Sequence, residues 1–324
     1  MAVRLVRPPG TDAEASPDRA LAPRWTCALV NNMPDGAFDA TERQFVGLLE
    51  AGSKDQVVEV TRSTMEGVPR GERIADRIAR EYLPVDSIRA NPPDLLIVTG
   101  SNPLEPRIED EPYWDDLSGL LSWGREHVPS MLLSCLSAHA ALSVFDGIER
   151  TTLPAKCTGV FPQQAHPDHP LASGLGTEVV LPHSRLNAVP TDVVLAAGYE
   201  IAVGSEQVGW SVISRTNGSS RVVLVQGHPE YDPSSLLREY HRDVRRYVLG
   251  ERDEEPRLPL DCVARSDWAQ LRSLHDRIVG GDRDPALVES FPFEEMGDRA
   301  DWPWRETAIG LYANWMADAT ERND

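Results

Sequence analysis

The sequence of 324 residues predicts an α/β fold, namely a doubly wound and mostly parallel sheet. Short apolar runs alternate with helix-like stretches, and short connections join them, which is typical of such folds. The apolar content of the run 94–100, which Gly100 closes, is continuous rather than alternating, as expected for a central parallel strand. In this fold class, functional groups lie at the carboxyl ends of the strands.

Composition and charge narrow the range of functions. With 41% hydrophobic and 26% charged residues, the chain can bury the core of one large or two small domains. The 51 acidic residues outnumber the 32 basic ones, and the net charge of −19 argues against a nucleic-acid partner or a membrane surface. An anionic ligand must therefore bind at a local site. Only two of the basic residues are lysines, Lys54 and Lys156.

Signals for export or membrane insertion are missing from the sequence. No apolar run approaches the roughly 18 residues of a transmembrane helix, and the N-terminus lacks the order of a secretory signal. We therefore expect a cytoplasmic protein. The cysteines have neither CxxC nor Cys/His ligand spacing, which favours neither a disulfide scaffold nor a zinc site. They are Cys27, Cys135, Cys157 and Cys262.

The elements of the first half follow in a regular order. Residues 1–24 lack periodicity and predict a flexible N-terminal arm, so the folded α/β domain is expected over 25–250. A capping box at Asp39–Glu42 and a proline at Pro112 each indicate a helix start. The predicted elements are strand 25–30, a helix from 39, strand 57–60, a helix ending near Tyr82, strand 94–100, helix 112–127, strand 131–134 and helix 138–145.

The second half of the chain is less regular. Residues 150–220 are rich in Pro, Gly and short strand-like pieces, and we interpret them as excursions that cover one edge of the sheet. A further strand at 221–226 leads to a helix that Pro233 opens. Residues 251–324 are an acidic C-terminal segment that ends in an amphipathic stretch, and we expect it to pack on the same domain.

Cys135 stands between a buried strand and the start of a helix. A helix N-terminus combines a positive dipole end with unpaired N–H groups, which favours a thiolate. The backbone N–H of Leu136 could then serve as an oxyanion donor. A buried structural thiol is the alternative, since free cysteine is among the most buried residue types.

His228 and Glu230 follow the end of the later strand. Because neighbouring parallel strands end at the same edge, His228 could take a proton from Cys135 while Glu230 orients the imidazole. A strand-ending turn with a solvated carboxylate is the alternative for this short motif. The two strand ends together predict a Cys-His-Glu triad.

A series of motifs covers about residues 25–318. In order, they are Asn32-Met-Pro34, Thr99-Gly100, Tyr113-Trp114, Cys135 with Ala140-Ala141-Leu142, Lys156 before Gly159-Val160, Pro182-His-Ser-Arg185, His228-Pro-Glu-Tyr-Asp232, Arg242-Asp243, Trp304-Arg305 and Asn314-Trp315. This series resembles the homoserine O-acyltransferases of methionine biosynthesis, the homoserine O-succinyltransferase family. The resemblance implies the flavodoxin-like, class I glutamine-amidotransferase-like fold.

The resemblance also implies a ping-pong reaction. Cys135 would take the acyl group, succinyl or acetyl, from acyl-CoA, and His228 would deprotonate the hydroxyl of L-homoserine. Glu230 would hold His228. The resemblance further implies a homodimer, and neither a metal nor a bound cofactor beyond the CoA co-substrate.

Four further residues are assigned to substrate binding by the same resemblance. They are Lys156, Ser184, Arg185 and Arg242. Arg242 suits a two-pronged contact with the acceptor carboxylate. Without the resemblance, Arg242 would be interpreted as a solvated residue of the charged run 238–246, and Ser184 would be interpreted as a hydroxyl in a turn.

Several positions depart from the family pattern. Leu136 and His139 stand where the family usually has Trp and Gln, and Asp35-Gly36 replaces a lysine pair near the expected donor entrance. Acyl choice in the family depends on one position, small for succinyl and Glu for acetyl. Leu104 occupies it without a gap and Glu105 with one gap, so the donor stays open.

Three other functions stay open. L-Serine as acceptor would give an O-acylserine for cysteine or specialised sulfur metabolism, and one methylene is worth only about 1–3 kcal/mol in a pocket. A glutaminase shares the Cys and His-x-Glu arrangement, although the run 133–137 lacks its Gly-rich elbow. A non-catalytic binding protein is the third, against which the intact Cys135, His228 and Glu230 argue.

Overall fold

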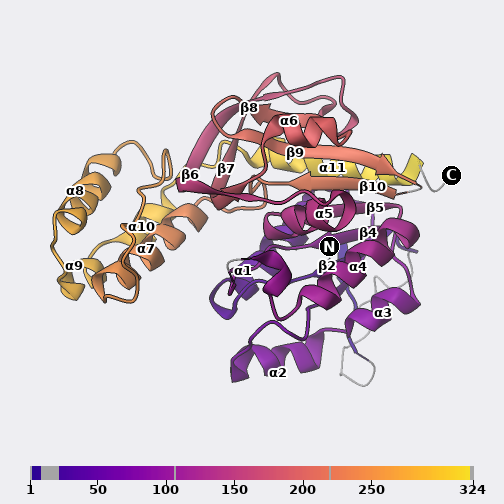
Figure 1. The fold of residues 1–324 in the computed structure, drawn as a ribbon, viewed down its shortest axis with the longest axis horizontal. Helices are drawn as coiled ribbons and strands as arrows, with labels where there is room; N and C mark the ends of the chain where they lie inside the picture. The colour runs from indigo at the N-terminus through magenta and orange to yellow at the C-terminus, as the bar shows by residue number, and fades with distance from the viewer. Residues whose placement is uncertain (1, 9–21, 106, 219, 322–324) are drawn as a thin grey trace.

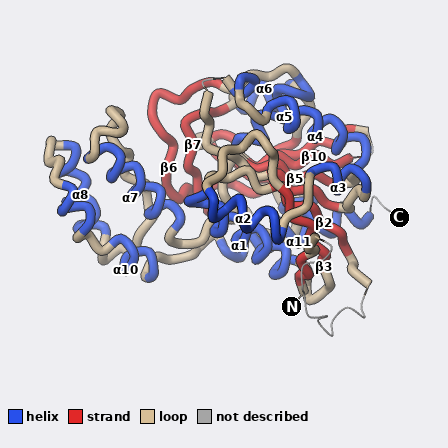
Figure 2. The backbone as a smooth tube through the Cα atoms, turned by 90° about the horizontal axis from the view of Figure 1, so that it is seen from below, coloured by secondary structure: helices blue, strands red, loops and turns tan. Residues whose placement is uncertain are grey.

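The computed structural model describes residues 2–8, 22–105, 107–218 and 220–321. Within these residues a single ten-stranded sheet has the order β1-β3-β2-β4-β5-β10-β9-β8-β6-β7. Pairs from β1 to β10 in this order are parallel, and those from β10 to β7 are antiparallel. Helices lie on both faces of the sheet (Figures 1 and 2). The predicted α/β fold with a mostly parallel sheet is confirmed.

Strands and helices alternate in the first half and separate in the second. The strands are β1 (Val3–Leu5), β2 (Trp25–Val30), β3 (Val58–Ser63), β4 (Leu95–Val98), β5 (Ser130–Ser134), β6 (Thr151–Ala165), β7 (Glu178–Ala188), β8 (Glu200–Ser205), β9 (Gly209–Asn217) and β10 (Ser220–Val225). The α-helices are α1 (Asp35–Gly52), α2 (Glu72–Glu81), α3 (Val85–Ala90), α4 (Trp114–His127), α5 (Leu136–Asp146), α6 (Thr191–Ala196), α7 (Ser235–Val248), α8 (Trp268–Val279), α9 (Pro285–Glu289), α10 (Phe293–Asp298) and α11 (Arg305–Glu321). Short 3-10 turns lie at Ile108–Asp110 and Pro170–Ala172.

Alternate residues of the central strands pack into two separate cores. Leu95 and Ile97 of β4 face the core that α1 and α11 cover. Leu96 and Val98 face the core that α4 and α5 cover. Because both faces are buried, the strand is apolar at every position, as the sequence predicted.

The fold begins earlier than the sequence suggested. Residues 3–5, assigned to the flexible arm, form the edge strand β1, in which Val3 pairs with Val58 of β3. The N–H of Val6 donates to the carbonyl of Val60 at 2.9 Å, and the N–H of Val58 donates to that of Ala2 at 2.8 Å. Residues 9–21 of the predicted arm lie outside the described residues.

The predicted capping box at 39–42 is wrong. Helix α1 begins at Asp35, so Asp39 and Glu42 lie inside it. Glu42 does not reach back to a helix start, because it pairs with the buried Arg62 of β3 at 3.0 Å. The local pattern predicted that Glu42 caps a helix, but its side chain forms an ion pair with Arg62, which is distant in sequence.

Residues 150–220 extend the sheet, whereas the sequence suggested only excursions over its edge. Strand β10 pairs in parallel with β5 on one side and antiparallel with β9 on the other. The antiparallel strands β9, β8, β6 and β7 then continue beyond it (Figure 1). The carboxyl ends of β5 and β10 therefore lie side by side at the centre of the sheet.

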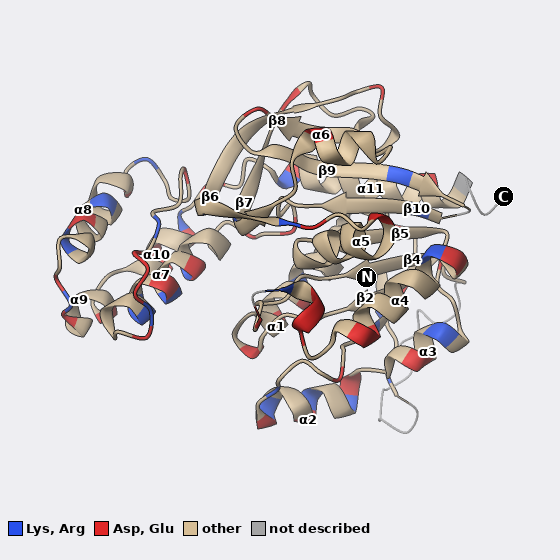
Figure 3. Cartoon of the chain, in the orientation of Figure 1, with Lys and Arg blue, Asp and Glu red and all other residues tan. Residues whose placement is uncertain are grey.

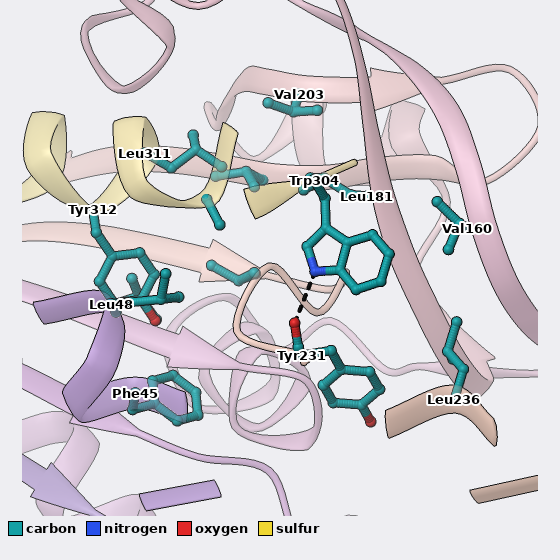
Figure 4. Close-up of a cluster of buried hydrophobic side chains, with 14 of the residues drawn as sticks. Phe45, Leu48, Val160, Leu181, Val203, Tyr231, Leu236, Trp304, Leu311 and Tyr312 are labelled. Atoms are coloured by element: carbon teal, nitrogen blue, oxygen red, sulfur yellow. Dashed lines mark hydrogen bonds between the residues drawn. The ribbon is translucent and has the colours of Figure 1, made fainter. Parts of the chain in front are cut away.

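The C-terminal segment divides into two parts. Helices α8, α9 and α10 lie beside α7 in a lobe at one end of the molecule (Figures 1 and 2). Helix α11 returns to the sheet and packs against α1. Two indole N–H groups fix this return: Trp304 donates to the carbonyl of Tyr231 at 2.8 Å (Figure 4), and Trp315 donates to Ser130 Oγ at 2.7 Å.

Acidic and basic residues are interspersed on the helices and loops, as Figure 3 shows. None of the helices in the described part combines the length and the apolar composition that a bilayer crossing requires.

Candidate active site

Cys135 occupies a sharp turn between β5 and α5. Its φ of 53° and ψ of −111° are unusual for a residue with a side chain. The backbone N–H of Cys135 donates to the carbonyl of Val225 at 2.7 Å, which ties the turn to the end of β10. A strained residue between a strand and a helix is the geometry of a nucleophile elbow, since it exposes the side chain at the top of the sheet.

The N-terminus of α5 offers a backbone donor beside Cys135. Leu136 is the first residue of α5, and no carbonyl of the described chain accepts from its N–H. Gly100 borders this donor: a Cβ added there would lie 3.1 Å from Cys135 Cβ and 3.4 Å from the Leu136 nitrogen. The missing side chain of Gly100 keeps space for an oxyanion that Leu136 could bind.

His228 and Glu230 form a buried pair after β10. The Nδ1 atom of His228 lies 2.7 Å from Glu230 Oε1, and both residues are 6% exposed. Burial acts to lower the pKa of His228, but the Glu230 carboxylate and the adjacent Cys135 outweigh it and raise that pKa well above its ordinary value. Glu230 occupies Nδ1, so Nε2 is the ring nitrogen left for proton transfer, and Cys135 is close enough to influence the pKa of His228.

These contacts bring together the three residues of the predicted triad. The Cys135–Val225 hydrogen bond joins the two strand ends, and the Cys135 side chain is close enough to raise the pKa of His228. Their catalytic roles stay predictions.

A second cluster of polar residues joins β6, β7 and α7. Lys156 Nζ lies 2.8 Å from Asp243 Oδ2 and 3.3 Å from Glu239 Oε2. The Ser184 hydroxyl donates to Glu239, and Arg242 Nη2 lies 3.1 Å from Asp243 Oδ1. Three of the predicted substrate-binding residues, Lys156, Ser184 and Arg242, therefore meet through two carboxylates.

Both carboxylates of this cluster are held ionised. Burial acts to raise the pKa of Asp243, but the charges of Lys156 and Arg242 have the larger, opposite effect, so this pKa is lowered overall. The pKa of Glu239 is lowered against burial by Lys156 and by hydrogen bonds from Ser184 and Tyr231. Lys156 and Arg242 thus face two anions, and a third cation, Arg252, lies 3.8 Å from Asp243 Oδ1 through its Nη1 atom.

The sequence did not identify Glu239 as a site residue, and it placed Asp243 only in the motif Arg242-Asp243. The run 238–246 resembles a solvated charged face because arginines dominate it. A signal was present, since Glu239 and Asp243 are four residues apart and therefore share one face of a helix.

Arg185 lies apart from this cluster, inside the fold. Its guanidinium donates to the carbonyls of Asn187 and Val208 and to His183 Nδ1. No described carboxylate forms an ion pair with it. Burial lowers the pKa of Arg185, while the nearby thiols Cys157 and Cys135 act to raise it. The backbone contacts fix Arg185 as a positive charge near Cys135.

The loop after β4 carries Leu104 and Glu105. Their backbone N–H groups donate to Glu111 Oε1 at 2.8 Å and 3.1 Å. Glu111 is buried, whereas the Leu104 side chain is 52% exposed and Glu105 is also exposed. The loop is therefore held through its backbone, with both candidate donor-selecting side chains directed outward.

Two of the positions that depart from the family pattern, His139 and Asp35, have partners within the chain. His139 Nε2 lies 3.1 Å from Gln226 Oε1, and burial together with the charges of nearby arginines lowers the pKa of His139 to about 4. Asp35 Oδ1 lies 3.6 Å from Nη1 of Arg70. The first residue is uncharged at neutral pH, and the second has a cationic partner.

A pocket of about 450 Å³ reaches the back of the triad from the α1 side. Its wall includes Glu230 but neither Cys135 nor His228, so we do not assign it to the reacting substrates. The lining residues are Arg43, Gln44, Gly47, Leu48, Glu50, Ala51, Glu230, Asp232, Trp302 and Arg305.

The fold is of the class I glutamine-amidotransferase-like type, and it places a cysteine at the elbow with a His-Glu pair beside it. A solved structure of a glutamine amidotransferase from Methylobacillus flagellatus is similar over 92% of this chain and 96% of its own, with a TM-score of 0.51 and 18% identity. This likeness concerns the fold alone.

Sequence comparison is more specific. The family model described as homoserine O-succinyltransferase matches residues 13–322. The homoserine O-succinyltransferase of Rhodopseudomonas palustris is 39% identical over 93% of this chain and 90% of its own length. The homoserine O-succinyltransferase of Bradyrhizobium japonicum is 36% identical over 97% of this chain and 96% of its own. The chain belongs to the homoserine O-succinyltransferase family, as its motifs predicted.

Proposed function

We propose that this chain transfers an acyl group from acyl-CoA to the side-chain hydroxyl of L-homoserine through an acyl-Cys135 intermediate. The observation that carries the proposal is the elbow cysteine joined to the buried His228–Glu230 pair. The name of the family makes succinyl-CoA the first donor to test.

The first half-reaction loads the enzyme. The Cys135 thiol gives its proton to His228, and its sulfur bonds to the thioester carbon. The carbon–sulfur bond to CoA then breaks, and the CoA thiolate takes the proton from His228. The raised pKa of His228 supports this step, because the imidazolium persists long enough to protonate a leaving thiolate. The Leu136 N–H would stabilise the developing oxyanion.

The second half-reaction unloads the enzyme. His228 takes the proton of the homoserine hydroxyl, whose oxygen bonds to the acyl carbon. The bond from that carbon to Cys135 sulfur breaks, and His228 returns the proton to the thiolate. Each group ends in its starting state, which is what a ping-pong cycle requires.

The cluster around α7 supports an amino acid as acceptor. Lys156 and Arg242 carry positive charge, and Glu239 and Asp243 carry negative charge. An amino acid presents a carboxylate and an ammonium group a few ångströms apart, so it can pair with both signs. These cations, with Arg252 beside Asp243, also explain how a chain with a net charge of −19 could bind an anionic carboxylate.

A matrix of two donors and two acceptors tests the proposal. Succinyl-CoA and acetyl-CoA are each combined with L-homoserine and L-serine, and product masses are recorded. We expect O-succinylhomoserine as the main product, and an acyl adduct on the enzyme that is lost in Cys135→Ala. If neither donor labels Cys135, the proposal is wrong and glutamine hydrolysis is the next assay. A preference for serine would assign the alternative acceptor.

A further inference from the structure

We propose that Tyr231 is a positioning residue that links the general base to the acceptor pocket. The inference rests on the proposed function, because it assigns separate roles to His228 and to the cluster around Glu239. Tyr231 directly follows Glu230 in the motif His228–Asp232, and the sequence assigned it no role.

The ring of Tyr231 stacks on the imidazole of His228. The ring centroids are 4.2 Å apart and the planes differ by 20°. Glu230 holds the imidazole at its edge, through Nδ1. An edge contact alone leaves the ring free to tilt, whereas a stacked neighbour covers one face and opposes that motion.

The hydroxyl of Tyr231 reaches the other group. It donates to Glu239 Oε1, while Glu239 Oε2 accepts from Ser184 and lies near Lys156. Burial and the charges of Glu239 and Glu230 raise the pKa of Tyr231 well above its ordinary value, so the phenol remains a donor. One side chain therefore touches both the base and the carboxylate that gathers the acceptor-binding residues.

Tyr231 is itself held firmly. Its carbonyl accepts from the Trp304 indole at 2.8 Å, and its N–H donates to the carbonyl of His228 at 3.1 Å. Figure 4 shows Trp304 bonded to the Tyr231 backbone among buried side chains. A side chain with a fixed backbone, a stacked ring and a bonded hydroxyl can transmit a shift of Glu239 to His228.

The two half-reactions should therefore respond differently. In Tyr231→Phe the stack remains and only the bond to Glu239 is lost, so Cys135 acylation should stay within about twofold of the wild type. Transfer to homoserine from the isolated acyl-enzyme should fall by about tenfold or more, with a raised KM for homoserine. In Tyr231→Leu the stack is also lost, and both half-reactions should slow.

The experiment measures acylation by rapid quench and mass spectrometry without acceptor, then transfer after adding homoserine. Tyr240→Phe is the matched control, because Tyr240 is a buried tyrosine on α7 whose hydroxyl pairs with His275 Nδ1 at 3.1 Å. The NMR resonance of the His228 ring is recorded in every variant, since loss of a stacked aromatic ring changes the local ring current. We expect a shifted resonance in Tyr231→Leu and a nearly unchanged one in Tyr231→Phe.

The inference is overturned if Tyr231→Phe transfers the acyl group as fast as Tyr240→Phe, or if the His228 resonance is unmoved in Tyr231→Leu. A wild-type enzyme that forms no acyl adduct with either donor would instead reject the proposed function. The link would still be tested then, because the NMR measurement needs no substrate.

Discussion

The Nε2 atom of His139 lies 3.1 Å from the side-chain oxygen of Gln226. His139 lies one turn into α5, the helix that follows Cys135, and Gln226 follows β10. The amide nitrogen of Gln226 donates in turn to the carbonyl of Trp210 at 2.9 Å. The amide orientation places its oxygen toward His139, so a neutral imidazole with a proton on Nε2 completes the chain of hydrogen bonds. His139, at a position where the resemblance led us to expect glutamine, thereby adds no charge beside Cys135 at neutral pH.

Replacing His139 with Gln should leave the activity within about twofold of the wild type and make the protein more acid-tolerant. The pKa of His139 is lowered by burial from 6.5 to about 4 in the folded state. Between these values the unfolded chain binds the extra proton, so stability is lost as the pH falls from 6.5 towards 4. His139→Gln should avoid up to about 3 kcal/mol of this loss. Urea unfolding at pH 7 and pH 4 measures it, with the exposed His127→Gln as control, and equal losses in all three proteins would contradict the prediction.

Adding a methyl group at Gly100 should slow acylation of Cys135 by about tenfold or more. The new Cβ would lie 3.4 Å from the Leu136 nitrogen, in the space that the oxyanion would occupy. Single-turnover acylation with succinyl-CoA measures the effect, and Gly47→Ala, where the new Cβ meets nothing within 4 Å, is the control. Unchanged acylation in Gly100→Ala would remove Leu136 from the oxyanion role.

Replacing Lys156 with Met should raise the KM for homoserine by about tenfold or more and spare acylation. The methionine keeps much of the apolar stem but leaves Glu239 and Asp243 without their shared cation. Lys156 lowers the pKa of both carboxylates against burial, so both pKa values should rise in this variant. Steady-state kinetics with varied homoserine provide the test, and Lys54→Met, at an exposed position, is the control. Equal KM values in the two variants would exclude an acceptor-binding role for Lys156.

Replacing Glu230 with Gln should lower the pKa of His228. Burial acts downward on this pKa, and the Glu230 carboxylate is the largest of the effects that raise it. The imidazolium should therefore be lost at a lower pH in Glu230→Gln, and the alkaline side of the acylation rate profile should shift in the same direction. NMR titration of the His228 ring measures this pKa directly. An unchanged midpoint would mean that Glu230 does not control the charge of His228.

Replacing Arg62 with Met should cost about 3–5 kcal/mol of unfolding free energy, because it leaves buried carboxylate charge with fewer partners. The Arg62 side chain is 1% exposed and pairs with Glu42 and Glu81, each at 3.0 Å. Arg73, with 67% of its side chain exposed, pairs with Asp39 at 2.9 Å. Arg73→Met should therefore cost less than about 1 kcal/mol. Urea unfolding of both variants gives the comparison, and similar losses would contradict it.

Much of the fold could be predicted where local pattern and tertiary structure agree. The strand Leu95–Val98 is buried because its two faces pack against two cores. The absence of polar residues in this run indicates that burial in the sequence. The start of α1 could not be predicted, because the Glu42 side chain pairs with Arg62 of β3 and does not cap the helix. Val3–Leu5 could not be predicted either, because an edge strand of three residues gains its order from β3 and carries little pattern of its own.

The sequence by itself determined the family, the order of the α/β elements and the residues proposed for the triad. These are local features, since a strand end, the helix start after Cys135 and a short motif can each be recognised within a few residues. Only the tertiary structure decided which charges meet. Lys156 pairs with Asp243 although 87 residues separate them, and Tyr231 touches both His228 and Glu239 because the turn after β10 faces α7. Electrostatic partners depend on distance in space, and the sheet sets that distance between segments far apart in the chain.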